Sequence, residues 1–177
     1  LAVMKKALLE NLPIREAIGK IDAFLTKPPD RNDTDPLWRE KNAVDTGKQM
    51  SLFLFHKALN EFGQDLKHEQ QLTEILANMF MELFTAESTI SRAKYSVDTK
   101  QADPIVLDIA RAHTAEVSLS LLNMALTGMN GINRGKLSDS SVEYLKNFEE
   151  RMLLPTDIIG LKRSIAEFVY LKFSYPF

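Results

Sequence analysis

The most regular hydrophobic pattern in the chain occupies residues 71–94, QLTEILANMFMELFTAESTISRAK. Apolar residues recur there in alternating steps of four and three, at Leu72, Leu76, Met79, Leu83, Ala86, Ile90 and Ala93. Positions three and four apart lie on one face of a helix, so the pattern predicts a long α-helix with one buried seam. Phe80 and Phe84 widen the apolar face. We therefore expect this helix to be the spine of a bundle, covered on more than one side.

Two further long helices are expected around this segment, and each begins with Asp-Pro. A capping carboxylate followed by proline at the first helical position is a common start signal. The first helix is predicted over residues 36–62, with Gly63 as its stop, and the other over residues 104–127, with Gly128 as its stop. Gly47 inside the first helix indicates a closely packed neighbour, because a mid-helix glycine costs about 1 kcal/mol relative to alanine.

The second of these helices should bury one apolar row. Its members are Ile105, Ile109, Ala112, Leu119, Leu122 and Leu126. The first helix carries two rows, which indicates two neighbours or one neighbour and a subunit contact. They are Met50, Leu54 and Ala58 in one row and Leu52, Phe55, Leu59 and Phe62 in the other.

Shorter helices are predicted at both ends of the chain, over residues 1–11, 13–26, 138–152 and 156–173. Residues 26–35 separate the N-terminal helices from the main bundle as an exposed loop, because DRNDTD contains no apolar residue. Ser138 or Ser140 should cap the penultimate helix, with Glu143 three residues after Ser140. The expected buried faces are Val142, Leu145, Phe148 and Met152, and then Ile158, Leu161, Ile165 and Phe168.

These patterns predict an all-α fold, an up-down helical bundle with three long helices and several shorter ones, in a single domain of 177 residues. The formal charge of −2 gives no basic field, so nucleic acid is not an expected partner. The absence of cysteine excludes disulfides and thiol nucleophiles and fits a cytoplasmic location. No apolar run approaches the roughly 20 residues of a membrane span.

Candidate catalytic and metal-binding patterns all have simpler structural explanations. A di-iron bundle requires Glu-x-x-His on two helices, and none of His56, His68 and His113 has a Glu three residues before it. His113 and Glu116 lie one helical turn apart and could form an acid-base pair, but an interhelical hydrogen bond is the favoured interpretation. We therefore expect no catalytic, cofactor-binding or metal-binding residue in this chain.

The remaining polar and aromatic clusters are also interpreted as structural. GMNGINRG, residues 128–135, matches no phosphate-binding spacing and is expected to be a helix-helix turn. Trp38 should anchor the start of its helix, and Glu87 should form an ion pair at the edge of the seam. The other edge charges, Glu82, Arg92 and Lys94, are expected to be solvated or salt-bridged, and Phe53, Phe55 and Phe62 to be core or interface. Lys162 and Arg163 make the last helix amphipathic, and packing on the bundle is favoured over contact with a membrane surface.

One family shares these features in the same order along the chain. ILANMFMELFTAESTISRAK, residues 75–94, resembles a helix in the C-terminal extension of long acyl-CoA dehydrogenases, the very-long-chain type and its bacterial relatives. MKKALLENLPI, residues 4–14, is similar to the segment that follows the dehydrogenase core, and residues 154–177 are similar to the extreme C-terminus of that family.

The resemblance implies an FAD-dependent parent that oxidises a fatty acyl-CoA thioester to the 2,3-enoyl-CoA. It implies that a glutamate of the core removes the α-proton while the flavin accepts hydride. The chain contains no Glu-Gly pair of the family's E-G-T-N motif and begins at Leu1, so we expect a fragment that binds no FAD itself. The implied partners are the dehydrogenase core and further copies in a homo-oligomer.

Three functions follow as hypotheses. The first is a structural or assembly domain of an acyl-CoA dehydrogenase of fatty acid β-oxidation, not catalytic alone. The alternative is a stand-alone helical interaction or regulatory module. A complete small enzyme on a bundle has the least support, because no convergent site is visible.

Overall fold

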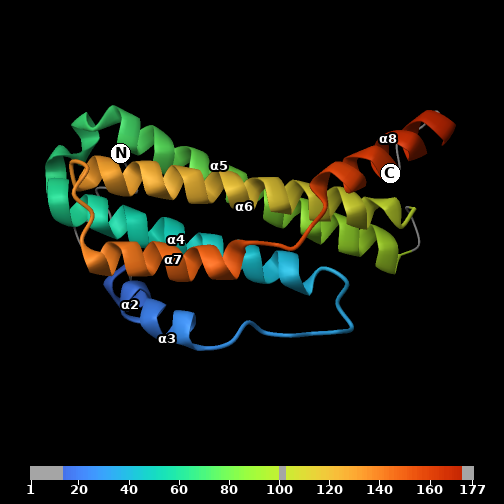
Figure 1. The fold of residues 1–177 in the computed structure, drawn as a ribbon, viewed down its shortest axis with the longest axis horizontal. Coiled ribbons are helices and arrows are strands. Elements are labelled where there is room, and N and C mark those ends of the chain that lie inside the picture. The colour runs from blue at the N-terminus through green and yellow to red at the C-terminus, as the bar shows by residue number, and fades with distance from the viewer. Residues whose placement is uncertain (1–13, 100–102, 173–177) are drawn as a thin grey trace.

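Three long antiparallel helices dominate the computed structural model, which describes residues 14–99 and 103–172. They are α4 (Trp38–Phe62), α5 (Gln70–Asp98) and α6 (Ile105–Ile132), and they lie side by side in Figure 1. The expected all-α fold with three long helices is confirmed. The predicted helix over residues 1–11 lies outside the described residues.

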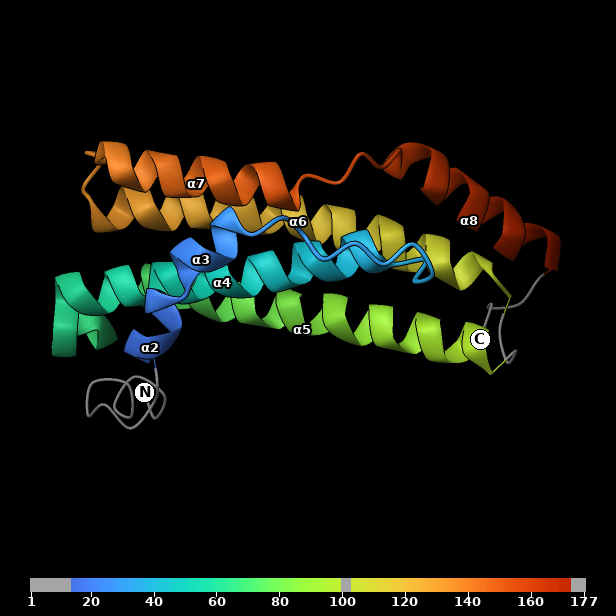
Figure 2. The ribbon, with the colours of Figure 1, turned by 90° about the horizontal axis from the view of Figure 1, so that it is seen from below.

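Shorter elements surround these three helices. A 3-10 helix, η1 (Gly63–His68), joins α4 to α5. Two short helices, α2 (Ile14–Gly19) and α3 (Ile21–Thr26), precede α4, while α7 (Asp139–Met152) and α8 (Ile158–Lys172) follow α6. Figure 2 shows α7 lying along α6, with α8 beyond it at the end where α6 begins.

Helix α6 is the centre of the bundle, and not α5 as the sequence suggested. It packs against α4, α5, α7 and α8, whereas α5 packs chiefly against α4 and α6. Small residues permit this crowding, since Ala110, Ala112, Ala115 and Ala125 are all buried on α6. A helix enclosed on several sides must be apolar on several faces, and α6 has that composition.

The seam predicted on α5 is confirmed residue by residue. The residues buried on α5 are Leu72, Leu76, Met79, Leu83, Ala86, Ile90 and Ala93. The expectation that Phe80 and Phe84 extend the buried face is wrong, because their side chains are 48% and 71% exposed. Each lies one residue beyond a seam position, and a step of about 100° around the helix carries it out of the contact with α4 and α6.

Asp-Pro starts both long helices by the expected mechanism, though each begins slightly later than predicted. The Asp35 carboxylate accepts from the Leu37 N–H at 3.0 Å, and the Asp103 carboxylate accepts from the Ile105 N–H at 3.2 Å. Gly63 follows the last residue of α4 with φ of 53°, a conformation that glycine adopts without strain.

Gly128 does not end α6, contrary to the prediction, and the helix continues to Ile132. A Cβ atom added at Gly128 would lie 2.8 Å from Leu54 Cδ2, so this glycine serves the close approach of α6 to α4. The turn begins only at Asn133 and includes Arg134 and Gly135, both with positive φ. Residues 128–132 of the predicted turn are therefore helical.

The buried row of α6 also differs from the predicted one. Of the six expected residues only Ala112 is buried, and Leu119 and Leu126 are 50% and 47% exposed. The buried large side chains are Val106, Val117, Leu121, Met129 and Ile132. Apolar residues occur on several faces of α6, so the periodicity of its sequence alone could not identify the row that faces α4 and α5.

The short elements depart from prediction in smaller ways. Residues 14–26 form two helices, α2 and α3, separated at Lys20. Asp35 is buried at the end of the loop that was expected to be exposed, and Thr26 belongs to α3. Ser138, and not Ser140, caps α7, accepting from the Ser141 N–H at 3.3 Å.

The two C-terminal faces are only partly as expected. Phe148 and Met152 are buried on α7, but Val142 is 49% exposed. The described part of α8 buries no residue completely, although its predicted face is half-buried against α6. The packing of α8 on the bundle is thus confirmed, and its contact is shallow.

Gly47 provides a test of the close packing at the centre. A Cβ atom there would lie 2.8 Å from Leu83 Cδ2 and 3.0 Å from Leu121 Cδ1. We expect Gly47→Leu to lower the free energy of unfolding by about 2 kcal/mol or more, because added methylenes overpack a filled core. The control is Gly131→Leu in the exposed part of α6, where nothing lies within 4 Å. Urea denaturation that shows equal effects for the two variants would contradict this explanation.

Candidate functional site

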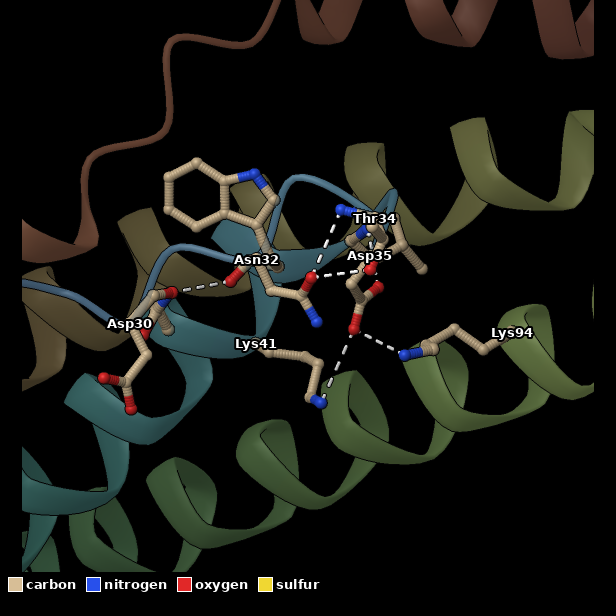
Figure 3. A network of polar contacts seen from close by, with 9 residues as sticks. Asp30, Asn32, Thr34, Asp35, Lys41 and Lys94 are labelled. Carbon is tan, nitrogen blue, oxygen red and sulfur yellow. Dashed lines mark hydrogen bonds and ion pairs between the residues drawn. The ribbon is translucent and has the colours of Figure 1, made fainter.

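A buried carboxylate organises the most extensive polar cluster in the described residues. Asp35 precedes α4, and its side chain is 6% exposed. Its Oδ2 accepts from Lys94 of α5 in a short ion pair and lies 3.6 Å from Lys41 Nζ of α4. Figure 3 shows both lysines pointing toward this carboxylate. One side chain thus joins the loop to two helices.

The loop itself is shaped by a local turn before Asp35. The Asn32 Oδ1 accepts from the Thr34 hydroxyl at 2.7 Å and from the Thr34 N–H at 3.2 Å, as Figure 3 shows. Asn and Asp side chains favour such turns because their oxygens reach the backbone two residues on. The Asp35 N–H then donates to the Asn32 carbonyl at 3.0 Å. This turn aims Asp35 into the bundle.

Three helices hold the rest of the loop through its backbone carbonyls. Asn42 of α4 donates to the Asp30 carbonyl at 2.7 Å, and Arg111 of α6 donates to the Pro36 carbonyl at 3.3 Å. Arg151 of α7 donates to the Lys27 carbonyl at 2.6 Å. The exposed loop is therefore attached along its length to the body of the bundle.

The electrostatics of Asp35 follow from this geometry. Burial alone would raise the pKa of the carboxyl. Together, the hydrogen bonds from Lys94 and from the Leu37 N–H and the charges of Lys94 and Lys41 outweigh that effect. The pKa of Asp35 therefore lies below its ordinary value, and the ionised form stabilises the fold.

The pKa of Glu40, in the first turn of α4, is shifted in the opposite direction. Its side chain lines a pocket of about 330 Å³ with Arg39, Arg111 and the segment that leads into α8. Glu40 is 6% exposed, and burial raises its pKa, only partly offset by its own N–H and by the charges of Arg111 and Arg39. Two acidic groups, Glu40 and Asp157, and two basic groups, Arg39 and Arg111, thus share the wall of one small pocket, which leaves it without a strong net charge.

The candidate acid-base residues are separated in the structure. His113 Nε2 lies 3.2 Å from the Thr85 hydroxyl of α5, while Glu116 pairs with Lys162 of α8. The favoured interpretation, an interhelical hydrogen bond, is confirmed for His113. The proposed His113–Glu116 pair is not formed, because each side chain points to a different neighbouring helix.

Three of the edge charges of α5, Glu82, Glu87 and Lys94, are used in contacts with other segments of the bundle. Glu87 pairs with Lys48 of α4 at 2.6 Å, as expected. Glu82 is half-buried and not solvated: its Oε1 accepts from the Ser120 hydroxyl of α6 at 2.9 Å. Lys94 pairs with Asp35. These groups fix the position of α5 against its neighbours and form no convergent site.

The aromatic residues singled out in the sequence are structural as well. Phe53 and Phe55 are buried in the core and Phe62 packs against it. Trp38 opens α4, where the Arg39 guanidinium lies 5.2 Å from its ring centre. Its expected role at the start of the helix fits this position.

Metal binding has no geometric support in the part of the chain that the structure describes. No group of three or more His, Asp or Glu side chains there could hold an ion.

None of the described helices is long and apolar enough to cross a membrane.

Sequence reasoning missed the two buried acidic residues near the start of α4. Asp35 was recognised as a helix cap, but its partner Lys94 is 59 positions away, and no local pattern indicates that pairing. Glu40 lies in the first turn of α4, where an acidic residue is expected to face solvent. In the structure it is 6% exposed, in a pocket that it shares with Arg111 of α6 and the segment before α8.

An apolar groove between α6 and α7 is the other notable surface. Its volume is about 450 Å³, and its apolar lining includes Leu122, Leu126, Val142 and Leu145. Leu126 and Val142 are each about half exposed. Both residues were predicted to be buried, so this groove is a place where the bundle leaves apolar surface open.

Comparison with known proteins points to one family. Residues 46–145 match the model described as "Acyl-CoA dehydrogenase, C-terminal domain". A crystal structure of an acyl-CoA dehydrogenase complexed with FAD from Bacillus anthracis superposes with a TM-score of 0.83 at 20% identity. The match covers 97% of this chain and 29% of that one. A search of curated proteins finds no match.

The role of Asp35 can be tested by removing its charge. We expect Asp35→Asn to lower the free energy of unfolding by about 2 kcal/mol at neutral pH, because hydrogen bonds to charged groups contribute about 1.5–3 kcal/mol. The folded-state pKa is the lower one, so this contribution is complete above the unfolded-state pKa of about 4 and is lost as the pH falls further. Urea denaturation as a function of pH measures it.

The matched control for Asp35 is Asp33→Asn in the same loop. The Arg31–Asp33 pair is exposed, at 72% and 67%, so its loss should change stability by less than about 0.5 kcal/mol. A difference between wild type and Asp35→Asn that did not shrink below about pH 4 would contradict the assignment.

Removing the charge of Glu40 should stabilise the fold, whereas removing that of Asp35 should destabilise it. We expect Glu40→Gln to raise the free energy of unfolding at neutral pH by about 0.5–1 kcal/mol, because it removes a charge that burial disfavours. The folded-state pKa is the higher one, so the gain should disappear below about pH 4, where both states are protonated. Glu61→Gln, an exposed change on the same helix, is the control. A loss of stability in Glu40→Gln would show that its attraction to Arg111 dominates.

Proposed function

The chain belongs to the family of acyl-CoA dehydrogenase C-terminal domains, and we propose that it acts as the C-terminal helical domain of an FAD-dependent acyl-CoA dehydrogenase. The observation that carries the proposal is the family match over residues 46–145, which contain all of α5 and α6. The chain spans 29% of the length of the Bacillus anthracis structure it matches. In the proposed parent, the remaining length supplies the chemistry.

The reaction proposed for the whole protein is oxidation of a fatty acyl-CoA to the 2,3-enoyl-CoA in cytoplasmic β-oxidation. A base of the core would remove the α-proton, and FAD would accept hydride from the β-carbon. The resemblance of residues 75–94 to the very-long-chain type and its bacterial relatives supports a fatty acyl-CoA as the substrate class. The FAD and acyl-CoA sites are assigned to the core and not to this domain.

The role proposed for the domain is structural, in assembly with that core and within a homo-oligomer. The polar groups described above support this role, because Asp35, Glu82 and Glu87 all have partners on other segments of the same bundle. Apolar surface remains open on α5, in the α6/α7 groove and on α8. Such surface is typical of domains that pack against further protein.

The test uses the complete natural gene. We expect an open reading frame that continues upstream of Leu1 and encodes a flavoprotein core. The purified product should have a flavin absorbance band that bleaches when a fatty acyl-CoA is added anaerobically. Removing residues 14–172 from that protein should lower its thermal stability or its oligomeric state more than its affinity for FAD.

Two results would contradict the proposal. A start codon adjacent to Leu1 with no flavoprotein encoded in frame would leave a stand-alone helical interaction module. A full-length protein that loses FAD on the single change Glu40→Gln would move the cofactor site into this domain.

A further inference from the structure

The outward face of α5 carries a second repeat, of uncharged residues, parallel to the buried seam. Its positions follow steps of four and three: Ala77, Met81, Phe84, Ser88, Ser91 and Tyr95. All six side chains are exposed, and none is charged. We call these six residues the outer stripe.

The outer stripe is unusual because its large members are exposed together. Met81 is 59% exposed, Phe84 71% and Tyr95 62%, and Phe80 beside them is 48% exposed. Single exposed apolar residues need no explanation, but Met81, Phe84 and the adjacent Phe80 form an exposed cluster, which indicates a binding surface. Ser88 and Ser91 separate Tyr95 from this cluster along the stripe. Figure 2 shows α5 along an outer edge of the bundle, so this surface is open to a partner.

The order of residue sizes along the stripe indicates which partner fits. If a second α5 is placed antiparallel, with the two-fold axis at the level of Ala86, three pairs face each other twice. Ala77 then meets Tyr95 of the second copy, Met81 meets Ser91, and Phe84 meets Ser88. Every large side chain faces a small one, which is the arrangement that allows helices to interdigitate.

The parallel alternative lacks this complementarity. It would set Phe84 against Phe84 and leave Ser88 and Ser91 opposite themselves. The antiparallel arrangement also satisfies the rule that a two-fold interface uses one self-complementary patch. Glu87, the acidic residue nearest the axis, already has its counter-ion in Lys48 at 2.6 Å.

We propose that the outer stripe of α5 binds the same stripe of a second copy of this chain, forming an antiparallel helix pair about a two-fold axis. Residues 77–95 span about 27 Å of helix. A single pair of helices of that length is at the low end of specific interfaces, which bury about 1,200 Å² or more in total. The dimer should therefore have a Kd on the order of micromolar.

Sedimentation equilibrium of the full chain tests the surface. We expect a monomer–dimer equilibrium whose Kd rises by about thirtyfold or more in Phe84→Glu, because the change puts a charge at the centre of the contact. Phe84 is 71% exposed, so the variant should keep the helical circular dichroism of the wild type. The control is Ile159→Glu on α8, which is equally exposed at 73% and should change the Kd by less than about threefold.

The chain lacks cysteine, so engineered cysteines test the direction of the pair independently of any effect on folding. Met81→Cys and Ser91→Cys should form a disulfide-linked dimer when the two variants are mixed and oxidised. Each variant alone should not, because an antiparallel pair separates identical positions by about 15 Å along the axis. The read-out is the covalent dimer on a non-reducing gel.

Three outcomes would overturn the proposal. They are a chain that stays monomeric at concentrations well above the micromolar range, equal effects of Phe84→Glu and Ile159→Glu, and a disulfide formed by Met81→Cys alone, which would mean a parallel pair. A monomer would leave the outer stripe to another partner, such as a dehydrogenase core. The inference rests on the homo-oligomer of the proposed function, and the two can fail separately, because a monomeric chain would leave the flavin test of the full-length protein unchanged.

Discussion

The close approach of α4 to α6 is the constraint on which the rest of the bundle depends. It is made at two glycines, Gly47 and Gly128, each of which receives a leucine side chain where its own Cβ would lie. Leu121 of α6 and Leu83 of α5 reach Gly47, and Leu54 of α4 covers Gly128. Helices that pack this closely leave little room for rotation, so the contact determines which faces of α5 and α7 can be buried.

The same constraint explains why polar groups in the bundle serve the fold. Buried Glu40 of α4 interacts with the charge of Arg111 on α6, and the Arg111 guanidinium also donates to the Pro36 carbonyl before α4. Asp35 then meets Lys94 and offsets the cost of burying charge with an ion pair and a backbone hydrogen bond. A catalytic site needs side chains that converge on a cavity open to a substrate. In this bundle the charged residues contact one another instead.

How much of this the sequence predicts depends on how many neighbours a helix has. Helix α5 has a polar side, so its periodicity identified all seven buried positions. Helix α6 carries apolar residues on several faces, and the pattern could not show that Val106 and Leu121 are buried while Leu119 is exposed. Gly128 was misread for a related reason, since a glycine required by packing and a glycine that ends a helix look alike in sequence.

The long-range pairs of the candidate site were not predictable for a different reason. Asp35 and Lys94 come together only after α4 and α5 are aligned, and neither residue has a local signature of a partner. Phe80 and Phe84 carried usable information that a single-seam interpretation overlooked. A helix with two repeats of the same period has two faces to cover, and its own bundle covers one of them.

The composition of the two faces of α5 separates their roles. The buried seam contains Leu, Met, Ile and Ala, the aliphatic residues of a permanent core. The outer stripe contains Phe, Tyr, Met and Ser, and aromatic residues and methionine are enriched where protein surfaces meet and separate. Serine also tolerates water when the partner is absent. The outer stripe therefore has the chemistry of an interface that forms after the bundle has folded.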